Sequence, residues 1–204
     1  NISIAETTDN LAAFRERTPH GFFNSQEDSV PQDRYYAARI TSPGQIKLEQ
    51  QILRDPQPHE VLVRVTGCGL CASSIPVWEG REWFQYPLAP GAPGHEAWGI
   101  IEKVGNHITT LLPGQKVALL AGNTLSQFCY TTEYLCVPLP EPIHHFPLPG
   151  EPLGCAMNIF KRSDIRKDQD VAIIGAGFLG LLLIQLCKAE GARVTAVSKR
   201  KSSL

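Results

Sequence analysis

The feature that most constrains this 204-residue chain is an apolar run, DVAIIGAGFLGLLLIQLCKAEGARVTAVSKR, at residues 170–200. Its β-branched start predicts a buried strand, and the stretch after the glycines is apolar over about the length of a helix. Gly191 follows that stretch and would end the helix, and RVTAVS predicts a second strand. Strand, helix and strand make one βαβ unit, so we expect a parallel sheet of α/β type.

The most apolar part of this segment, residues 171–187, approaches the length of a short membrane span, but three glycines and Gln185 interrupt it. A strand, a tight turn and a buried helix explain it better than a transmembrane helix. The N-terminus has no basic segment followed by an apolar core, so we expect no secretory signal. Six cysteines at irregular spacings predict free thiols in a reducing, cytoplasmic setting.

The charge balance argues against polyanionic partners. The chain has 19 basic and 20 acidic residues, a formal net charge of -1. Nucleic acids and anionic membranes are bound by proteins with a marked basic surface. We therefore expect neither a nucleic acid nor a membrane as a partner.

The glycine turn indicates a ligand. Gly175, Gly177 and Gly180 form G-x-G-x-x-G between a predicted strand and a predicted helix, with Phe178 and Leu179 inside the motif. The first glycine permits a tight turn, the second lets a pyrophosphate approach the backbone, and the third lets helix and strand pack closely. The phosphates would lie on free N–H groups at the start of the helix. We expect a dinucleotide site here; the alternative is a purely structural turn.

The end of the second predicted strand bears on which dinucleotide binds. An acidic residue is expected there, to hold the ribose 2′-hydroxyl of NAD(H). This sequence has Ser198, Lys199 and Arg200 instead. A hydroxyl and two cations suit a 2′-phosphate, so NADP(H) is favoured over NAD(H). A solvated basic loop is the alternative.

The rest of the chain divides by composition. Residues 1–35 are polar and predict an N-terminal extension, residues 36–155 predict a β-rich, barrel-like domain, and residues 156–204 begin the nucleotide-binding unit. Trp78–Gly94 predicts a long loop, of the kind that is often functional. A helix is expected over residues 153–165. The expected strands span residues 35–40, 45–53, 60–70, 97–105, 115–120 and 133–138.

Three further residues suggest a metal. Cys71, His95 and Cys155 would give two thiolates and an imidazole, and three protein ligands leave a fourth zinc position open for water or substrate. Their wide spacing requires the fold to bring them together. Each has an ordinary alternative, because a lone cysteine is often a small core residue and a lone histidine a satisfied surface group. Cys68 and Cys71 form C-x-x-C, but no second close pair predicts a zinc ribbon.

The segment GHEAWGIIEKVGNHI resembles the zinc signature of the medium-chain dehydrogenase/reductase superfamily, the zinc-type alcohol dehydrogenases. GCGLCASS and EPLGCAMN are similar to the segments that carry its two metal-binding cysteines, and the likeness extends from about Tyr36 to Leu204. The positions that match the signature are Gly94, His95, Glu96, Gly99, Gly105 and Ile108.

The resemblance implies a GroES-like β-barrel catalytic domain followed by the first βαβ unit of a Rossmann domain, whose later strands this sequence does not contain. It implies one catalytic zinc bound by Cys71, His95 and Cys155, with Glu96 a carboxylate able to approach the metal. Ser73 would hydrogen-bond the substrate oxygen. Zinc would polarise a carbonyl or alcohol while NADP(H) exchanges a hydride. The full-length parent would be a homo-oligomer, and the present chain alone would be inactive.

Two positions depart from the family's pattern. Ser74 stands where many members have an aspartate that supports the metal-binding histidine, and Pro76 replaces a histidine of the proton relay. The close group of four cysteines for a structural zinc is missing. Two alternative functions remain: a zinc-free quinone or enone reductase of the same superfamily, and a non-catalytic metal-binding or interaction module.

Overall fold

This computed structural model describes residues 33–200, and the chain divides into residues 1–32 and residues 33–204. The predicted extension over residues 1–35 therefore lies almost wholly outside the described residues. Within them, the strands expected from the sequence are found with ends shifted by one or two residues, apart from the strand expected at residues 133–138. Only Cys136–Pro138 of that segment is a strand, because Glu133–Leu135 forms a 3-10 helix.

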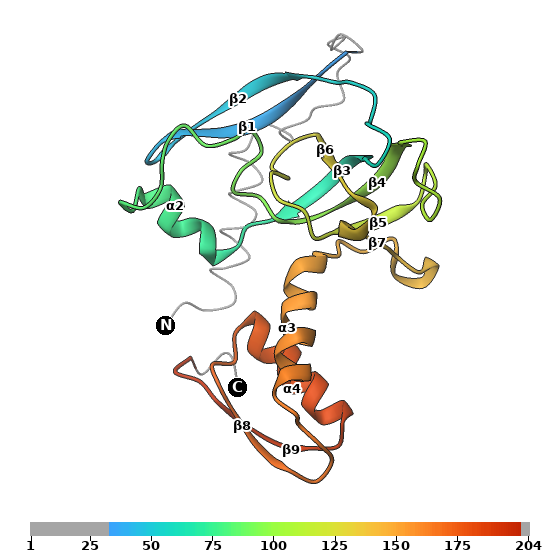
Figure 1. Ribbon diagram of the computed structural model, residues 1–204. Coiled ribbons are helices and arrows are strands. Elements are labelled where there is room, and N and C mark those ends of the chain that lie inside the picture. Colours follow the sequence, from blue (N-terminus) through green and yellow to red (C-terminus); the bar gives the residue numbers. More distant parts are fainter. Residues whose placement is uncertain (1–32, 201–204) are drawn as a thin grey trace, which may run out of the picture. The chain divides into compact units, whose positions relative to one another are not determined.

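A five-stranded antiparallel sheet occupies the middle of the chain, in the order β6-β3-β4-β5-β7 (Figure 1). Two nine-residue strands, β3 (Val61–Gly69) and β4 (Glu96–Val104), form its centre. The outer strands are β6 (Phe128–Thr131), β5 (Lys116–Leu119) and β7 (Cys136–Pro138). The sequence did not predict β6, because four residues are too few to show a clear alternation.

The core lies on one face of this sheet, and alternation along the strands builds it. Ala97 and Ile101 of β4 are buried, and Val61 and Val63 of β3 pack in the same cluster. Alternate residues of a strand point to opposite faces, so one face of β4 supplies the cluster while Glu102 is exposed.

Two cysteines belong to this core. Burial raises the pKa of Cys129 to about 11 and that of Cys136 to about 12. Both thiols are therefore protonated at neutral pH. They act as small apolar side chains in the cluster.

A separate hairpin precedes the sheet, formed by β1 (Arg34–Ser42) and β2 (Gln45–Ile52) (Figure 1). The other side of β1 is bonded to loops: the Ala38 N–H donates to Leu125 O at 2.8 Å, and the Ala38 carbonyl accepts from Gly91 N at 2.7 Å. The hairpin thus holds the loops at residues 88–94 and 123–127 in place.

Short elements fill the connections. The predicted long loop over Trp78–Gly94 begins inside a one-turn helix, α2 (Ile75–Glu79), and continues as turns. Three short 3-10 helices complete the domain: η1 (Ala72–Ser74), η2 (Glu133–Leu135) and η3 (Glu141–Ile143).

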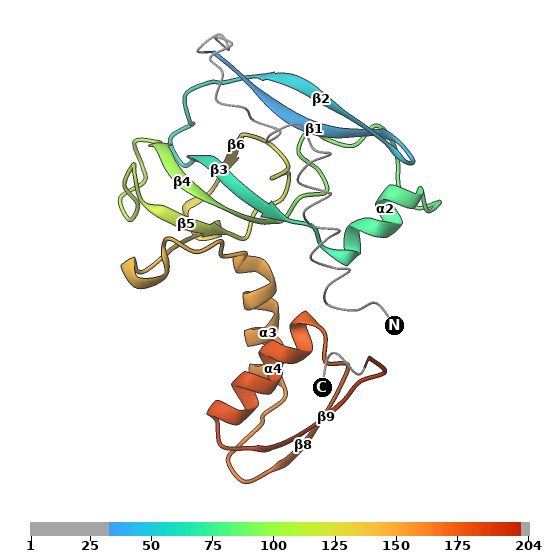
Figure 2. The same cartoon turned by 180° about the vertical axis from the view of Figure 1, so that it is seen from behind.

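The C-terminal part is the βαβ unit that the sequence predicts. It consists of β8 (Asp170–Ile174), α4 (Phe178–Ala189) and β9 (Arg193–Val197), with the two strands parallel. The helix before it, α3 (Gly150–Arg162), packs against α4, as both views show (Figures 1 and 2). Because α3 is continuous across residues 155 and 156, the domain boundary expected there falls inside a helix. Among the described residues, no helix is long and apolar enough to cross a membrane.

Candidate metal centre

The antiparallel pairing of β3 and β4 brings two distant segments together. Gly69, the last residue of β3, pairs with Glu96, the first residue of β4. Cys71 follows β3 by two residues, and His95 immediately precedes β4. Because antiparallel strands place the end of one beside the start of the next, Cys71 and His95 lie at the same end of the sheet.

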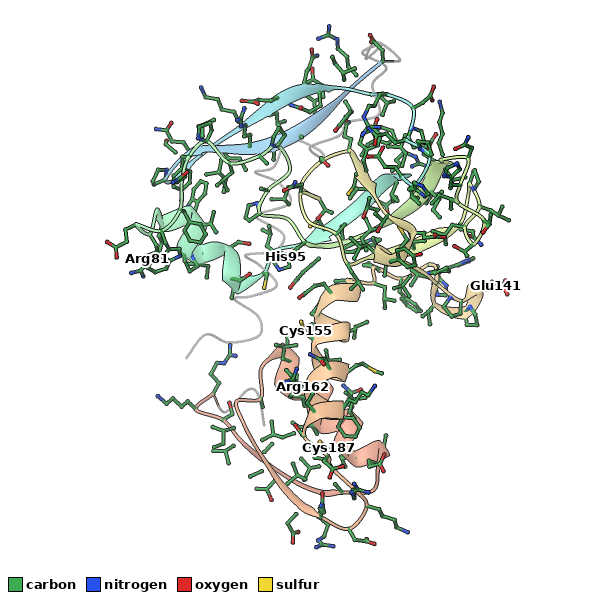
Figure 3. All side chains as sticks on the ribbon, in the orientation of Figure 1. Arg81, His95, Glu141, Cys155, Arg162 and Cys187 are labelled. Carbon is green, nitrogen blue, oxygen red and sulfur yellow. The ribbon has the colours of Figure 1, made fainter. Side chains whose placement is uncertain are left out.

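Cys71, His95 and Glu96 form a compact group of possible metal ligands. One ligand atom from each lies within 4.8 Å of the others, and all three side chains are half-buried. A thiolate sulfur, an imidazole nitrogen and a carboxylate oxygen are the donor types that zinc prefers. Figure 3 shows the labelled His95 where the chain enters β4. The donor set therefore fits one zinc ion.

The His95 ring is oriented by its own backbone neighbourhood. Its Nδ1 lies 2.9 Å from the carbonyl oxygen of Pro93. A carbonyl can only accept, so Nδ1 donates the hydrogen and Nε2 keeps a lone pair for a metal in the neutral ring. The Pro93 carbonyl thus supplies orientation that a carboxylate at position 74 was expected to give, and Ser74 makes no hydrogen bond to this ring.

The loop that carries Pro93 is fixed by close backbone packing. Gly91 has a φ of +85°, and a Cβ at that position would overlap the carbonyl oxygen of Asn123. Leu125 N donates to Gly91 O at 2.9 Å, and Thr124 N donates to Gly94 O at 3.1 Å. These contacts hold the segment just before His95, so the acceptor for Nδ1 is set before any metal binds.

Glu96 needs the glycine opposite it. A Cβ built on Gly69 would lie 2.5 Å from Oε2 of Glu96 and 3.1 Å from its Cβ. The carboxylate therefore lies over a backbone position that only glycine leaves free.

We expect Gly69→Ala to lower zinc affinity about tenfold while leaving the fold intact, because the added methyl displaces a flexible carboxylate that can turn away. Competition with a fluorescent zinc chelator measures the affinity, and thermal unfolding checks the fold. Gly122→Ala is the matched control, since a Cβ there meets nothing within 4 Å. Equal affinities for the two variants would contradict this role of Gly69.

Cys155, expected as the third ligand, lies beside the group and outside it. Cys155 is labelled on α3 in Figure 3. Its Sγ donates to Glu151 Oε1 at 3.0 Å. That hydrogen bond is the first cause of the raised pKa of the Cys155 thiol, followed by burial and the charges of Glu151, Cys71 and Glu96. Cys155 thus neighbours the group, and its role as a ligand stays a prediction.

Glu151 was missed in the sequence. It precedes Cys155 by four residues on α3, and residues four apart share one face of a helix. That spacing, seen beside a candidate metal-binding cysteine, was the available signal. Its carboxylate adds an oxygen donor on the same side of the helix as Cys155.

Two other candidates have separate surroundings. Ser73 lies in η1, two residues after Cys71, and is exposed. Cys68 points elsewhere: its Sγ lies 3.4 Å from Oγ1 of the buried Thr124. The C-x-x-C pair therefore does not act as one unit.

The glycine turn and the end of β9 do come together. Residues 174–177 and 197–200 line one cleft of about 440 Å³. Gly175 has a φ of +103°, and its N–H donates to Val197 O at 2.8 Å, which ties the turn to β9. Arg200 N donates to Ser198 Oγ at 3.2 Å. The predicted dinucleotide residues Gly175, Gly177, Ser198, Lys199 and Arg200 thus share one concave surface.

The chain resembles known dehydrogenases in sequence and in fold. Residues 57–150 match the alcohol dehydrogenase GroES-like domain. D-xylulose reductase A of Aspergillus niger is 32% identical over 72% of this chain and 50% of its own length. Sorbitol dehydrogenase of Ovis aries is 28% identical over 80% of this chain and 55% of its own length. The chain spans about half the length of the curated relatives it matches.

A solved structure agrees on the fold. The cobalt- and zinc-bound thermostable alcohol dehydrogenase from Pyrobaculum aerophilum superposes with a TM-score of 0.69 at 23% identity, covering 83% of this chain and 61% of its own. The shared fold is a GroES-like domain followed by a Rossmann βαβ unit. Residues 57–150 thus form the GroES-like domain of the alcohol dehydrogenases, and the similarity to curated dehydrogenases and reductases agrees with the medium-chain dehydrogenase/reductase signature in the sequence.

Proposed function

We propose that this chain carries the zinc site and the first part of the cofactor site of an oxidoreductase that transfers a hydride between NADP(H) and an alcohol or carbonyl. The observation that supports this most directly is the group of Cys71, His95 and Glu96 at one end of the β3–β4 pair. The activity is proposed for the whole protein, because this chain spans about half the length of its relatives.

The proposed ligands divide the work of binding. The Cys71 thiolate and the Glu96 carboxylate would bring two negative charges, and His95 would bind through the Nε2 that Pro93 leaves free. A zinc ion held there would supply Lewis-acid polarisation of the substrate oxygen. Ser73 is proposed to hydrogen-bond that oxygen and accept or release its proton, which suits an exposed hydroxyl two residues beyond Cys71.

The substrate class follows from the relatives. The names D-xylulose reductase and sorbitol dehydrogenase belong to enzymes of polyols and ketoses. We propose a polyol or the corresponding ketose as substrate. A ligand set of one sulfur, one nitrogen and one carboxylate oxygen would leave a position for a hydroxyl or carbonyl oxygen.

The zinc proposal is tested on this chain by elemental analysis after expression with sufficient metal. About one zinc per chain is expected. Less than about half an equivalent would contradict the zinc site and favour a zinc-free reductase.

The reaction is tested on the complete gene product, by following NADPH formation or loss with polyols and ketoses. If the protein bound zinc but turned over no alcohol or carbonyl, the oxidoreductase proposal would be refuted and the non-catalytic metal-binding module would be favoured.

The preference for NADP(H) rests on Lys199 and Arg200 at the lip of the cleft. We expect replacing both with alanine to weaken NADPH binding by about 10- to 100-fold, because two cations near a 2′-phosphate are removed. NADH, which lacks that phosphate, is the matched control and should change less than about threefold. Titration calorimetry of the complete protein measures both. An equal loss of NADH affinity would mean that the two cations contact the pyrophosphate, which both cofactors share, and not the 2′-phosphate.

A further inference from the structure

Within residues 33–200, no strand pairs with the outer edge of β2. Every second residue of β1 makes its backbone hydrogen bonds on the side away from β2. Tyr36 bonds to Gln127, Ala38 bonds to Leu125 and Gly91, and Ile40 bonds to Leu88. The intervening β1 residues therefore bond to β2, and their β2 partners occupy odd positions from Lys47 to Gln51.

The even positions of β2 consequently direct N–H and C=O groups outward. These residues are Ile46, Leu48, Gln50 and Ile52. Among residues 33–200, β2 pairs with β1 alone. An eight-residue strand with one open edge is a template for pairing with another chain.

The side chains on this edge strand are unusually apolar for a surface. Ile46 is 51% exposed, Leu48 52% and Ile52 72%. Such edges are commonly protected by charges, prolines or bulges. On β2 the charged residues Lys47 and Glu49 lie on the opposite face from the apolar ones, and neither blocks the edge.

Lys47 and Glu49 determine which register of a β2–β2 pair is favourable. A strand that meets a second copy of itself about a two-fold axis at Leu48 places Lys47 opposite Glu49 of the copy, twice. Leu48 then faces Leu48, and Ile46 faces Gln50. The outward groups of these even residues form the hydrogen-bonded pairs, and the two charge pairs take the closer, non-hydrogen-bonded positions.

Neighbouring registers lack this match. An axis at Lys47 places two lysines opposite each other, and an axis at Glu49 places two glutamates opposite each other, which is destabilising. Glu49 already accepts from Arg39 Nη1 through Oε2 at 3.0 Å. Its Oε1 remains available to a lysine from the copy.

We propose that β2 is a homodimerisation edge, which pairs antiparallel with β2 of a second copy about a two-fold axis at Leu48. The pairing joins the two hairpins into one four-stranded sheet, and it covers the exposed Leu48 with its counterpart. It does not depend on the proposed oxidoreductase activity.

Charge reversal on the full chain tests both the edge and its register. Lys47→Glu places two glutamates opposite each other, and Glu49→Lys two lysines, so each variant alone should dissociate at about tenfold higher concentration than the wild type. An equimolar mixture of the two variants restores both attractive pairs and should form a heterodimer. Light scattering after size exclusion, and sedimentation of the mixture with one variant labelled, measure these outcomes.

Controls separate a folding defect from a lost interface. Glu49→Lys places a lysine beside Arg39, so its thermal midpoint is compared with that of Lys47→Glu, which leaves the Arg39 contact intact. Lys161→Glu on α3 makes the same charge change away from β2. Leu48→Arg, at an exposed position on the axis, should also give monomers.

Three results would overturn the proposal. A wild-type chain that stays monomeric at all concentrations would mean that the edge is unused or is covered by another part of the chain, residues 1–32 included. If neither Lys47→Glu nor Leu48→Arg changed the dissociation of the dimer, the dimer would form through a surface other than β2. A mixture no more associated than its two components would exclude the register centred on Leu48.

Discussion

Cys71→Ser is expected to lower the zinc affinity of this chain by about 100-fold or more. Cys71 supplies the sole sulfur of the group formed with His95 and Glu96, and a serine hydroxyl at neutral pH remains protonated and binds zinc poorly. Even the loss of an outer-shell partner costs about 10- to 100-fold in metal affinity, so a direct ligand should cost more. Competition with a chelator of known affinity measures the change.

Cys68→Ser is the matched control, because it makes the same chemical change three residues earlier in the sequence. The Cys68 sulfur lies near Thr124 Oγ1, and a hydroxyl can keep that contact. Its zinc affinity should stay within about threefold of the wild type. If the two serine variants bound zinc equally well, Cys71 would not be a ligand. Cys155→Ser in the same assay decides whether the sulfur beside the group also binds.

Gly180→Ala is expected to destabilise the βαβ unit by about 1–3 kcal/mol, the usual range for overpacking a fitted contact. A Cβ there would overlap the carbonyl oxygen of Gly175 and lie 3.0 Å from its carbonyl carbon. Both are backbone atoms of the tight turn, so α4 must move away from the strand. Thermal or denaturant unfolding, together with hydrogen exchange in β8 and α4, measures the loss.

Gly177→Ala in the same motif should behave differently. Its φ of -89° is open to any residue, and the nearest atom to an added Cβ is Arg200 Nη2 at 3.9 Å. The fold should keep its stability, while dinucleotide affinity in the complete protein falls about tenfold or more, because the methyl occupies space needed by the pyrophosphate. Equal destabilisation by both substitutions would show that the two glycines do not have separate roles.

Local patterns were sufficient to predict most of the fold. The patterns at residues 60–70 and 97–105 predicted the central strands, which the structure places at Val61–Gly69 and Glu96–Val104. The β-branched run before Gly175 predicted the first strand of the βαβ unit. The sequence did not predict β6, because its four residues form a strand through pairing with β3 and are too few to show a pattern of their own. The one-turn helix α2 was missed for the same reason of length.

The candidate site divides in a similar way. The sequence by itself determined which residues could bind a metal or a phosphate, because donor chemistry and glycine freedom belong to the residue types at Cys71, His95, Glu96 and Gly175. Only the tertiary structure decided which of them meet. The register of Gly69 with Glu96 brings Cys71, His95 and Glu96 together, and the turn of α3 pairs Cys155 with Glu151. The tertiary structure also shows that the Pro93 carbonyl accepts a hydrogen bond from His95. Distances between residues far apart in sequence are set by strand pairing and loop packing, which no local pattern encodes.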